Sequence, residues 1–449
     1  MPIPQEHRDR CFYHFTHIDN IESIVKYGLL STNEKKKRGI RHVNLAAEEI
    51  QARRSVMEVN RYPYGTIHDY VPFYFASRTP MLLNVINRKN VDQQLIVYIA
   101  VSIDKLLKDN VIFTDASANA TERPNFYRDP RNLNSLNWIL IDSSGWGYDD
   151  RERRERMAEV LVYKRVPLDW IENYIVYNSF CKEKIIEIYK KYGLEKPKIL
   201  YTKKNGRFFY YTKFFLQGRQ NETLVTGPIS LSELYVDVIK EIKDKRKKIK
   251  KEKCIFLNID DALKKIIEDF CIIKELEDIY ELETENEVHN ETVSDHTIMV
   301  VENLSKNEYY NKLSTIDKKI VKLSAYLHDI GKGPVSKWKN GIQPVYPDHP
   351  ADSLRMTKRI LSEDFKNLSE YEIEKICLLV AYHDLIGDIL MKGRDEQQLL
   401  DLQITENDLD MLIALTLADV SAINEEWERR IRCILPEWEA RIRRELSRK

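Results

Sequence analysis

The sequence predicts an α+β protein, in which a domain of mixed strands and helices is followed by an all-α domain. Strand-like apolar runs at 70–75, 95–101 and 159–166 alternate with short amphipathic helical patterns in the first half. After about residue 255 glycine becomes rare and apolar residues recur at helical spacing, as in 318–330. The chain has 449 residues, more than one hydrophobic core usually organises, so two domains are expected.

In the first domain, the pattern NIESIVKYGLL predicts a helix that ends at Gly28, and EIQARR at 49–54 predicts a surface helix. The run YVPFYF reads as an aromatic strand. The dipeptide Asn205-Gly206 lies between two β-prone runs, which predicts a hairpin that closes this domain.

Two charge blocks follow. Residues 240–253 are strongly basic and residues 275–287 are acidic. Such blocks are usually solvated helix faces or linkers, and a phosphate-binding patch is the sharper interpretation of the basic one. We therefore expect three parts, namely a first domain at 1–215, a charged helical connector at 216–289 and a second domain at 290–449.

The overall composition does not by itself indicate a charged partner. The chain has 71 basic and 71 acidic side chains, so bulk charge does not indicate a nucleic-acid or membrane partner. The six cysteines are scattered without a CxxC pair, which is typical of a reducing compartment. With neither a leader pattern nor a membrane-length apolar run, a soluble cytoplasmic protein without membrane partners is expected.

Histidine and aspartate residues recur along the helical half at suggestive places. They are His296, the adjacent His328 and Asp329, His349, His383 and Asp419. A lone histidine on an apolar helix is ordinarily a satisfied core or surface residue. Imidazoles and carboxylates that arrive from separate helices, however, can enclose a divalent metal, which would activate water and neutralise phosphate charge. The pattern thus indicates phosphoester hydrolysis.

This series, with HDIGK around the His-Asp pair, resembles the HD superfamily of metal-dependent phosphohydrolases over residues 290–425. The segments HPADS and ADVSA are similar to the HD domain attached to bacterial CCA-adding enzymes. No glycine-tyrosine-proline signature follows His383, so cyclic dinucleotides are not supported as substrates. The resemblance implies one metal at His296, His328, Asp329 and Asp419, a second supported by His349 and His383, and phosphate contact by Lys332. The ligands do not distinguish Mn, Mg, Ni, Co or Fe, nor one ion from two.

In the first half, YHFTHIDNI, VPFYFASRTPMLL and MAEVLV occur in an order that resembles the DarT family of DNA ADP-ribosyltransferase toxins, over residues 10–215. Phe15 stands where the family commonly has an aliphatic residue, and Thr79 where serine is usual. Neither change removes a reacting group. The resemblance implies a split-sheet ADP-ribosyltransferase fold that binds NAD and modifies a base in single-stranded DNA.

It also implies roles for individual residues. These are catalysis by Glu159 and Arg54, and NAD binding by His14, Thr16, Arg53, Arg54, Tyr74 and Met81. A carboxylate suits this chemistry, because it stabilises the oxocarbenium-like ribose and accepts the proton of the incoming base nitrogen. No glycine-rich dinucleotide fingerprint is present, so the NAD assignment rests on the resemblance alone.

Single-strand binding favours aromatic and basic clusters, and Arg128 and Arg131 in NFYRDPRN are candidates. The preferred function is a toxin or phage-defence transferase, with a separate antitoxin as a further partner. The alternative is an NAD or single-stranded DNA sensor that controls an HD nucleotide phosphohydrolase. The sequence leaves open whether the second domain reverses, restrains or is independent of the transferase.

Overall fold

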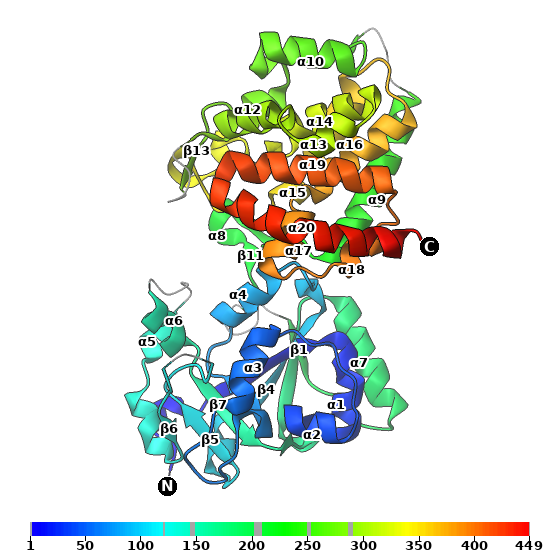
Figure 1. Ribbon diagram of the computed structural model, residues 1–449. Coiled ribbons are helices and arrows are strands. Elements are labelled where there is room, and N and C mark those ends of the chain that lie inside the picture. Colours follow the sequence, from blue (N-terminus) through cyan, green and yellow to red (C-terminus); the bar gives the residue numbers. More distant parts are fainter. Residues whose placement is uncertain are drawn as a thin grey trace. The chain divides into compact units, whose positions relative to one another are not determined.

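The computed structural model describes residues 2–119, 122–143, 149–201, 209–248, 253–285 and 291–448. It divides into two compact units (Figure 1). The first comprises Met1–Asn87 and Val91–Tyr211, and the second comprises Arg88–Asn90 and Thr212–Lys449.

The first unit is built on an eight-stranded mixed sheet with the strand order β10-β9-β4-β1-β3-β7-β5-β6. All neighbours pair antiparallel except β9 and β10. The strands are β1 (Cys11–His17), β3 (Tyr70–Tyr74), β4 (Ile96–Ser102), β5 (Val111–Thr114), β6 (Phe126–Tyr127), β7 (Glu159–Tyr163), β9 (Ile171–Val176) and β10 (Ile199–Tyr201), and β2 (Leu29–Leu30) pairs separately with β8 (Arg165–Val166). The three apolar runs predicted as strands are therefore confirmed.

The sheet is split between β1 and β3. Strand β1 pairs with β4 along its whole length, but it pairs with β3 only through Tyr13 and Tyr74. Pro72 lies in the middle of β3, and its carbonyl faces His14 of β1. The N–H and C=O groups of a strand residue point to the same side of the strand. Proline has no N–H, so at Pro72 strand β3 has no backbone donor to offer to β1. The ladder between β1 and β3 is thus interrupted at Pro72.

Helices surround this sheet (Figure 1). They are α1 (Ile21–Tyr27), α2 (Thr32–Lys37), α3 (Glu48–Val56), α4 (Pro80–Asn87), α5 (Trp138–Ile141), α6 (Asp150–Arg156) and α7 (Ser179–Lys191). Helix α1 ends at Gly28, as predicted, with φ at 78°, a conformation that glycine adopts without strain. Helices α1 and α7 pack together, and buried Ile21, Ile24 and Ile185 belong to the apolar core of this unit.

The second unit is largely helical. Its helices are α8 (Phe214–Gln217), α9 (Pro228–Arg246), α10 (Ile259–Glu268), α11 (Lys274–Glu277), α12 (Val293–Leu304), α13 (Glu308–Lys312), α14 (Thr315–Leu327), α15 (His349–Glu363), α16 (Glu370–Tyr382), α17 (Leu385–Lys392), α18 (Gln397–Asp401), α19 (Glu406–Ile423) and α20 (Glu425–Leu446). Helix α9 packs on α15 and α16 and buries Leu231, Val238 and Ile242, so the segment expected as a connector contributes to the core of this unit.

Short strands accompany these helices. They are β11 (Thr212–Lys213) with β12 (Arg219–Thr223), and β13 (Glu283–Glu285) with β14 (Ile342–Pro344). The pair β13 and β14 joins segments far apart in sequence, which helical periodicity could not indicate. The predicted hairpin at Asn205-Gly206 lies outside the described residues.

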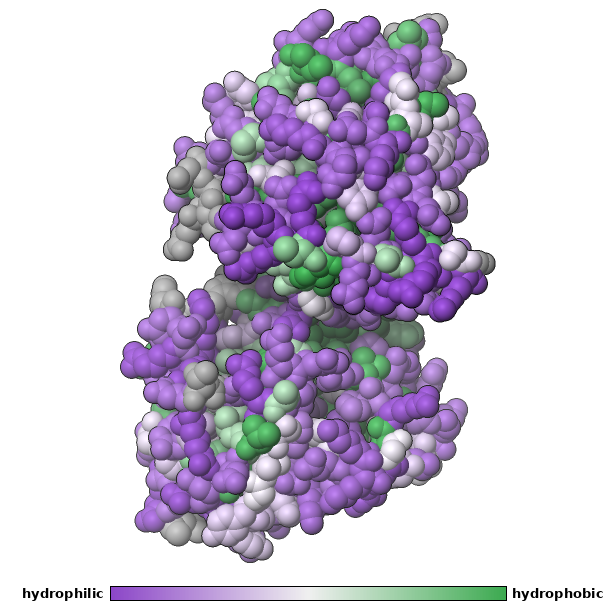
Figure 2. Space-filling view, in the orientation of Figure 1, coloured by the Kyte–Doolittle hydropathy of each residue, from purple (hydrophilic) through white to green (hydrophobic). Residues whose placement is uncertain are grey.

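The visible surface of each unit is mainly hydrophilic (Figure 2), and the apolar side chains are concentrated in the core of each unit. In the part of the chain that the structure describes, no helix combines the length and hydropathy that a membrane span requires.

Candidate active site and metal centre

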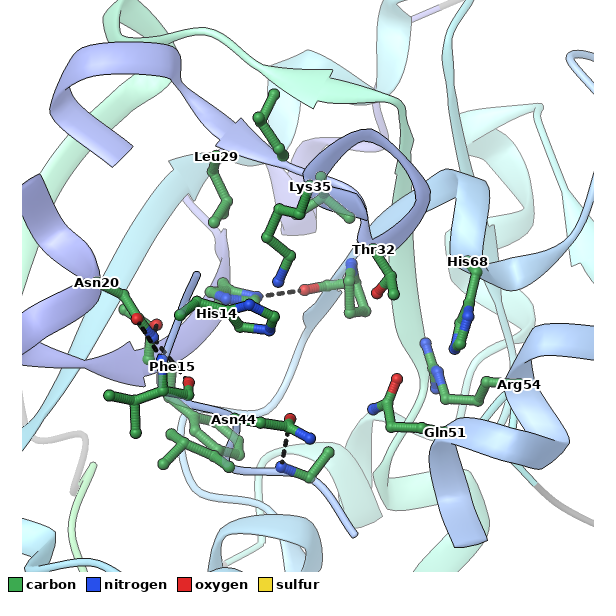
Figure 3. Close-up of a pocket in the computed structure, with 18 of the residues that line it drawn as sticks. His14, Phe15, Asn20, Leu29, Thr32, Lys35, Asn44, Gln51, Arg54 and His68 are labelled. Carbon is green, nitrogen blue, oxygen red and sulfur yellow. Dashed lines mark hydrogen bonds between the residues drawn. The ribbon is translucent and has the colours of Figure 1, made fainter. Parts of the chain in front are cut away.

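A cavity of about 330 Å³ opens in the first unit, lined by residues of β1, α2, α3 and β3 (Figure 3). This volume lies in the range of small-ligand pockets. Five of the predicted site residues line it, namely His14, Thr16, Arg54, Tyr74 and Met81. None of the described lining residues is aspartate or glutamate.

Glu159, the first residue of β7, lies fully buried beside this cavity. Its carboxylate accepts two parallel hydrogen bonds from Arg54, of 2.9 and 2.8 Å, and a third of 2.9 Å from the backbone N–H of Ala118. Burial alone would lower the pKa of Arg54, but the charge of Glu159 raises it. A buried pair with this geometry fixes both side chains, and the removal of one partner leaves a costly unpaired charge.

His14 lies at the split in the sheet. Its Nδ1–H donates to the Pro72 carbonyl at 2.7 Å. Burial lowers the pKa of His14 to about 4, so the ring is neutral at pH 7. Because Nδ1 carries the one ring proton, Nε2 is an acceptor. The ring can therefore accept a hydrogen bond from a hydroxyl group of a ligand.

The neighbours of His14 complete this part of the cavity. Tyr74 lies opposite Glu159 in the strand register, and burial together with the charge of Glu159 raises the pKa of Tyr74. Its hydroxyl consequently stays protonated at neutral pH. The Thr16 hydroxyl accepts a 3.0 Å hydrogen bond from Asn20, whose side-chain amide also binds both backbone groups of Val43.

Other predicted residues lie elsewhere. Arg53 is exposed on α3 and its Nε–H donates to the Glu49 carbonyl, and it does not line the cavity. The candidates for DNA contact are also outside the cavity, since Arg128 pairs with Asp109 at 3.1 Å and Arg131 pairs with Asp129 at 2.5 Å.

Sequence reasoning missed several cavity residues. They are Asn20, Lys35, Gln51, His68 and Ser117. Gln51 could have been found, because it precedes Arg54 by three residues and a helix places such residues on one face. Lys35 lies in a run of three lysines with no local feature that separates it from its neighbours.

In the second unit, five separate elements bring the predicted metal ligands together. His296 is on α12, His328 and Asp329 follow α14, His349 begins α15, His383 follows α16, and Asp419 is on α19. Their donor atoms form two groups that share Asp329, one with His296 and His328 and the other with His349 and His383. Within each group the donor atoms lie within 4.8 Å of one another.

Asp329 serves both groups through different oxygens. Its Oδ2 lies 3.3 Å from Nε2 of His328 and 3.6 Å from Nε2 of His296, whereas Oδ1 lies 3.2 Å from Nε2 of His349. Asp419 completes the first group, with Oδ1 3.0 Å from Nε2 of His296. This arrangement places one carboxylate oxygen of Asp329 toward each candidate metal position.

Backbone carbonyls hold three of the four histidines through the ring nitrogen that points away from the other ligands. The Nδ1–H group of His328 donates to the carbonyl of Ala325 at 2.7 Å, and that of His349 donates to the carbonyl of Tyr346 at 2.7 Å. The Nδ1–H group of His383 donates to the carbonyl of Val380 at 3.0 Å. Metal-binding histidines are held in this manner, with the other ring nitrogen left for the ion.

The residues fit a metal cation. Burial lowers the pKa of His349 and of His383, so both rings are neutral at pH 7, and their Nε2 lone pairs face each other at 3.0 Å. Two acceptors this close repel unless a cation lies between or beside them. Among the described residues, Nε2 of His328 and Oδ1 of Asp329 also have no hydrogen-bond partner.

The charge at this centre is set by Asp329 and its neighbours. Burial alone would raise the pKa of Asp329, but the charges of His328 and Lys332 hold it well below its ordinary value. Lys332 contacts Asp329 Oδ2 at 2.6 Å, which places a cation where a substrate phosphate could also be bound. The carboxylate is therefore ionised and available as a ligand.

Comparison with known proteins identifies relatives for each unit. A family profile described as "ssDNA thymidine ADP-ribosyltransferase, DarT" matches residues 13–210, and one described as "HD domain" matches residues 293–419. A DNA ADP-ribosyl transferase of Thermus sp. (strain 2.9) is 34% identical over 188 residues, covering 40% of this chain and 87% of the relative. A DNA ADP-ribosyl transferase of Thermus aquaticus is 30% identical over 219 residues, covering 47% of this chain and 91% of that enzyme.

A solved structure of Thermus sp. 2.9 DarT in complex with ADP-ribosylated single-stranded DNA is also similar. It is 31% identical, aligns with 45% of this chain and 96% of that chain, and gives a TM-score of 0.40. The relation to this family is given by the sequence identity to the two Thermus enzymes.

Proposed function

We propose, given that this chain belongs to the DarT family of DNA ADP-ribosyltransferases, that its first unit transfers ADP-ribose from NAD to a base of single-stranded DNA. The observation that carries the proposal is the buried pair of Glu159 and Arg54 beside a ligand-sized cavity. The description of the family profile names thymidine, which makes thymine the first acceptor to test.

The ribose of NAD would be held at the split in the sheet. Nε2 of the neutral His14 accepts a hydrogen bond from a ribose hydroxyl, and the protonated Tyr74 hydroxyl donates one. Both side chains line the cavity, and both are fixed by the backbone of β1 and β3. Holding the sugar in this way orients its reacting carbon toward Glu159.

In the reaction the bond between the ribose carbon and nicotinamide breaks, and nicotinamide leaves with the electron pair. The positive charge that develops on the ribose is stabilised by the carboxylate of Glu159. A base nitrogen then forms the new bond to the ribose carbon, and its proton passes to the carboxylate. Arg54 is bound to both oxygens of this carboxylate, so it would hold Glu159 in place and help to guide the base beside it.

The test is transfer of label from NAD to a single-stranded thymine-containing oligonucleotide by the full chain. Glu159→Gln keeps the size of the side chain but removes its charge, and we expect it to reduce transfer by at least a thousandfold. Arg53→Ala, on the exposed face of α3, is the matched control and should retain activity. NAD binding without transfer to any acceptor would favour the sensor alternative.

For the second unit we propose metal-dependent hydrolysis of a phosphoester. The two groups that share Asp329 support this, because imidazole nitrogens and carboxylates form the donor set that divalent metals take. A bound metal would supply activated water and neutralise phosphate charge. Lys332 would hold the phosphate beside Asp329.

This part is tested by measuring the metal content of the purified chain by mass spectrometry and then the release of phosphate or nucleotide from candidate esters. Tight metal binding without any hydrolytic product would contradict hydrolysis and leave a regulatory domain. The His328→Ala, Asp329→Ala double variant should lose both metal and product.

We also propose that the transferase activity of the first unit is toxic to the cell that produces it. A base carrying ADP-ribose no longer pairs normally, so a cell that expresses an active transferase should stop growing unless a separate antitoxin removes or prevents the modification. We expect growth arrest with the unaltered chain and normal growth with Glu159→Gln. Equal growth with both would contradict a toxin role.

A further inference from the structure

The basic side chains that line the candidate NAD cavity differ in whether a carboxylate of the protein already neutralises them. Lys35, Lys36 and Arg54 line it, and none of its described lining residues is acidic. A pocket with this charge favours an anionic ligand. The side chain that binds such a ligand must be one that no carboxylate of the protein already neutralises.

Arg54 does not. Both of its outer nitrogens are bound to the Glu159 carboxylate, so its charge is already compensated within the protein. A phosphate that approached Arg54 would also meet the negative charge of Glu159. The guanidinium is therefore a poor phosphate site as long as this pair is intact.

Lys35, in contrast to Arg54, has no carboxylate partner among the described residues. The acidic residue of its helix, Glu34, lies within ion-pair distance of Lys37 and Arg38. Among the described residues no carboxylate lies within ion-pair distance of Lys35, and burial lowers the pKa of Lys35 to about 8. The lowered value reflects a cation that has lost water without gaining a counter-ion.

The direction of the side chain supports this. Helix α2 begins after Ser31, whose hydroxyl accepts a hydrogen bond from the Glu34 N–H. The helix leaves Lys36 and Lys37 exposed, while Lys35 is half-buried. Figure 3 shows the Lys35 side chain extending into the cavity beside His14, with Gln51, Arg54 and His68 farther across it.

We propose that Lys35 neutralises the pyrophosphate of NAD in this cavity. The inference rests on the proposed function, since His14 would hold a ribose and the pyrophosphate is directly attached to both riboses of NAD. An ammonium group beside His14 therefore lies where a phosphate must pass, and it acts as a compact point charge. Sequence reasoning placed Arg53 and Arg54 among the NAD-binding residues and did not name Lys35.

The experiment compares ligand affinities by calorimetry in the full chain. For Lys35→Ala and Lys35→Gln we expect at least a tenfold loss of affinity for NAD and for ADP-ribose, with less than a twofold change for adenosine, which has no phosphate. Lys35→Arg should recover most of the loss. Lys37→Ala, which removes an exposed lysine of the same helix, is the matched control and should bind NAD normally.

Kinetics provide a second measurement that distinguishes positioning from catalysis. The KM for NAD should rise in Lys35→Ala, while kcat should change less than threefold. Unchanged NAD affinity in Lys35→Ala, or an equal loss for adenosine, would overturn the inference and leave the proposed function intact. If the unaltered chain does not bind NAD, the proposed function fails and this inference fails with it.

Discussion

In the first unit Glu159 is paired with a guanidinium and a backbone amide of its own chain, whereas in the second unit the neutral His349 and His383 turn their unprotonated Nε2 atoms toward each other. The carboxylate of the first site has its counter-ion before any substrate binds. The second donor set is electrostatically incomplete without a cation. Substitutions should therefore affect protein stability at the first site and ligand binding at the second.

The largest effect is expected at Asp329, because its oxygens serve both metal groups. Asp329→Ala should reduce metal affinity at both positions by at least a hundredfold. His383→Ala should affect only the second group, and it is the matched comparison. Metal titration followed by mass spectrometry gives the stoichiometry of each variant. Full stoichiometry in Asp329→Ala would show that this carboxylate is not a shared ligand.

At Arg54 we expect a loss of stability. Arg54→Ala leaves the Glu159 charge buried without its partner, which typically costs about 3–5 kcal/mol. The free energy of unfolding of the first unit, measured by urea titration, should fall accordingly. Arg53→Ala on the exposed side of α3 should change it by less than about 0.5 kcal/mol. Equal stability of both variants would mean that the pair contributes nothing in solution.

Metal removal should act on the second unit alone. A cation present at a hundredfold its Kd stabilises the folded state by about 2.7 kcal/mol, which for a unit of this size corresponds to about 5–10 °C in Tm. A chelator should therefore lower the Tm of the second unit and leave the first unchanged. Calorimetry of the full chain resolves the two transitions, and restoration by added metal is the control.

The smallest effect is expected from pH. Lys35 loses its proton as pH rises through about 8, so NAD affinity should be constant from pH 6 to 7 and fall severalfold by pH 9. Three histidines line the same cavity, namely His14, His42 and His68. They do not contribute to this decline, because burial lowers the pKa of each, and Arg54 stays charged. Lys35→Arg should abolish the decline, and a decline that persists in this variant would contradict the assignment.

Several elements of the first unit could be predicted from the sequence because they depend on local patterns. The apolar run at 70–75, the helix ending at Gly28 and the helix around Arg54 are confirmed, since period and capping act over a few residues. The relation to DarT and to HD proteins was also readable, because both depend on ordered motifs.

Only the tertiary structure decided which side chains meet. Arg54 and Glu159 are separated by 105 residues, and their pairing depends on the fold that brings one residue of α3 to the first residue of β7. Arg53 and Arg54 are equivalent in sequence, but only one faces the interior. The same holds for Lys35 among three consecutive lysines. Burial and partner choice depend on contacts between distant segments, so composition and periodicity cannot specify them.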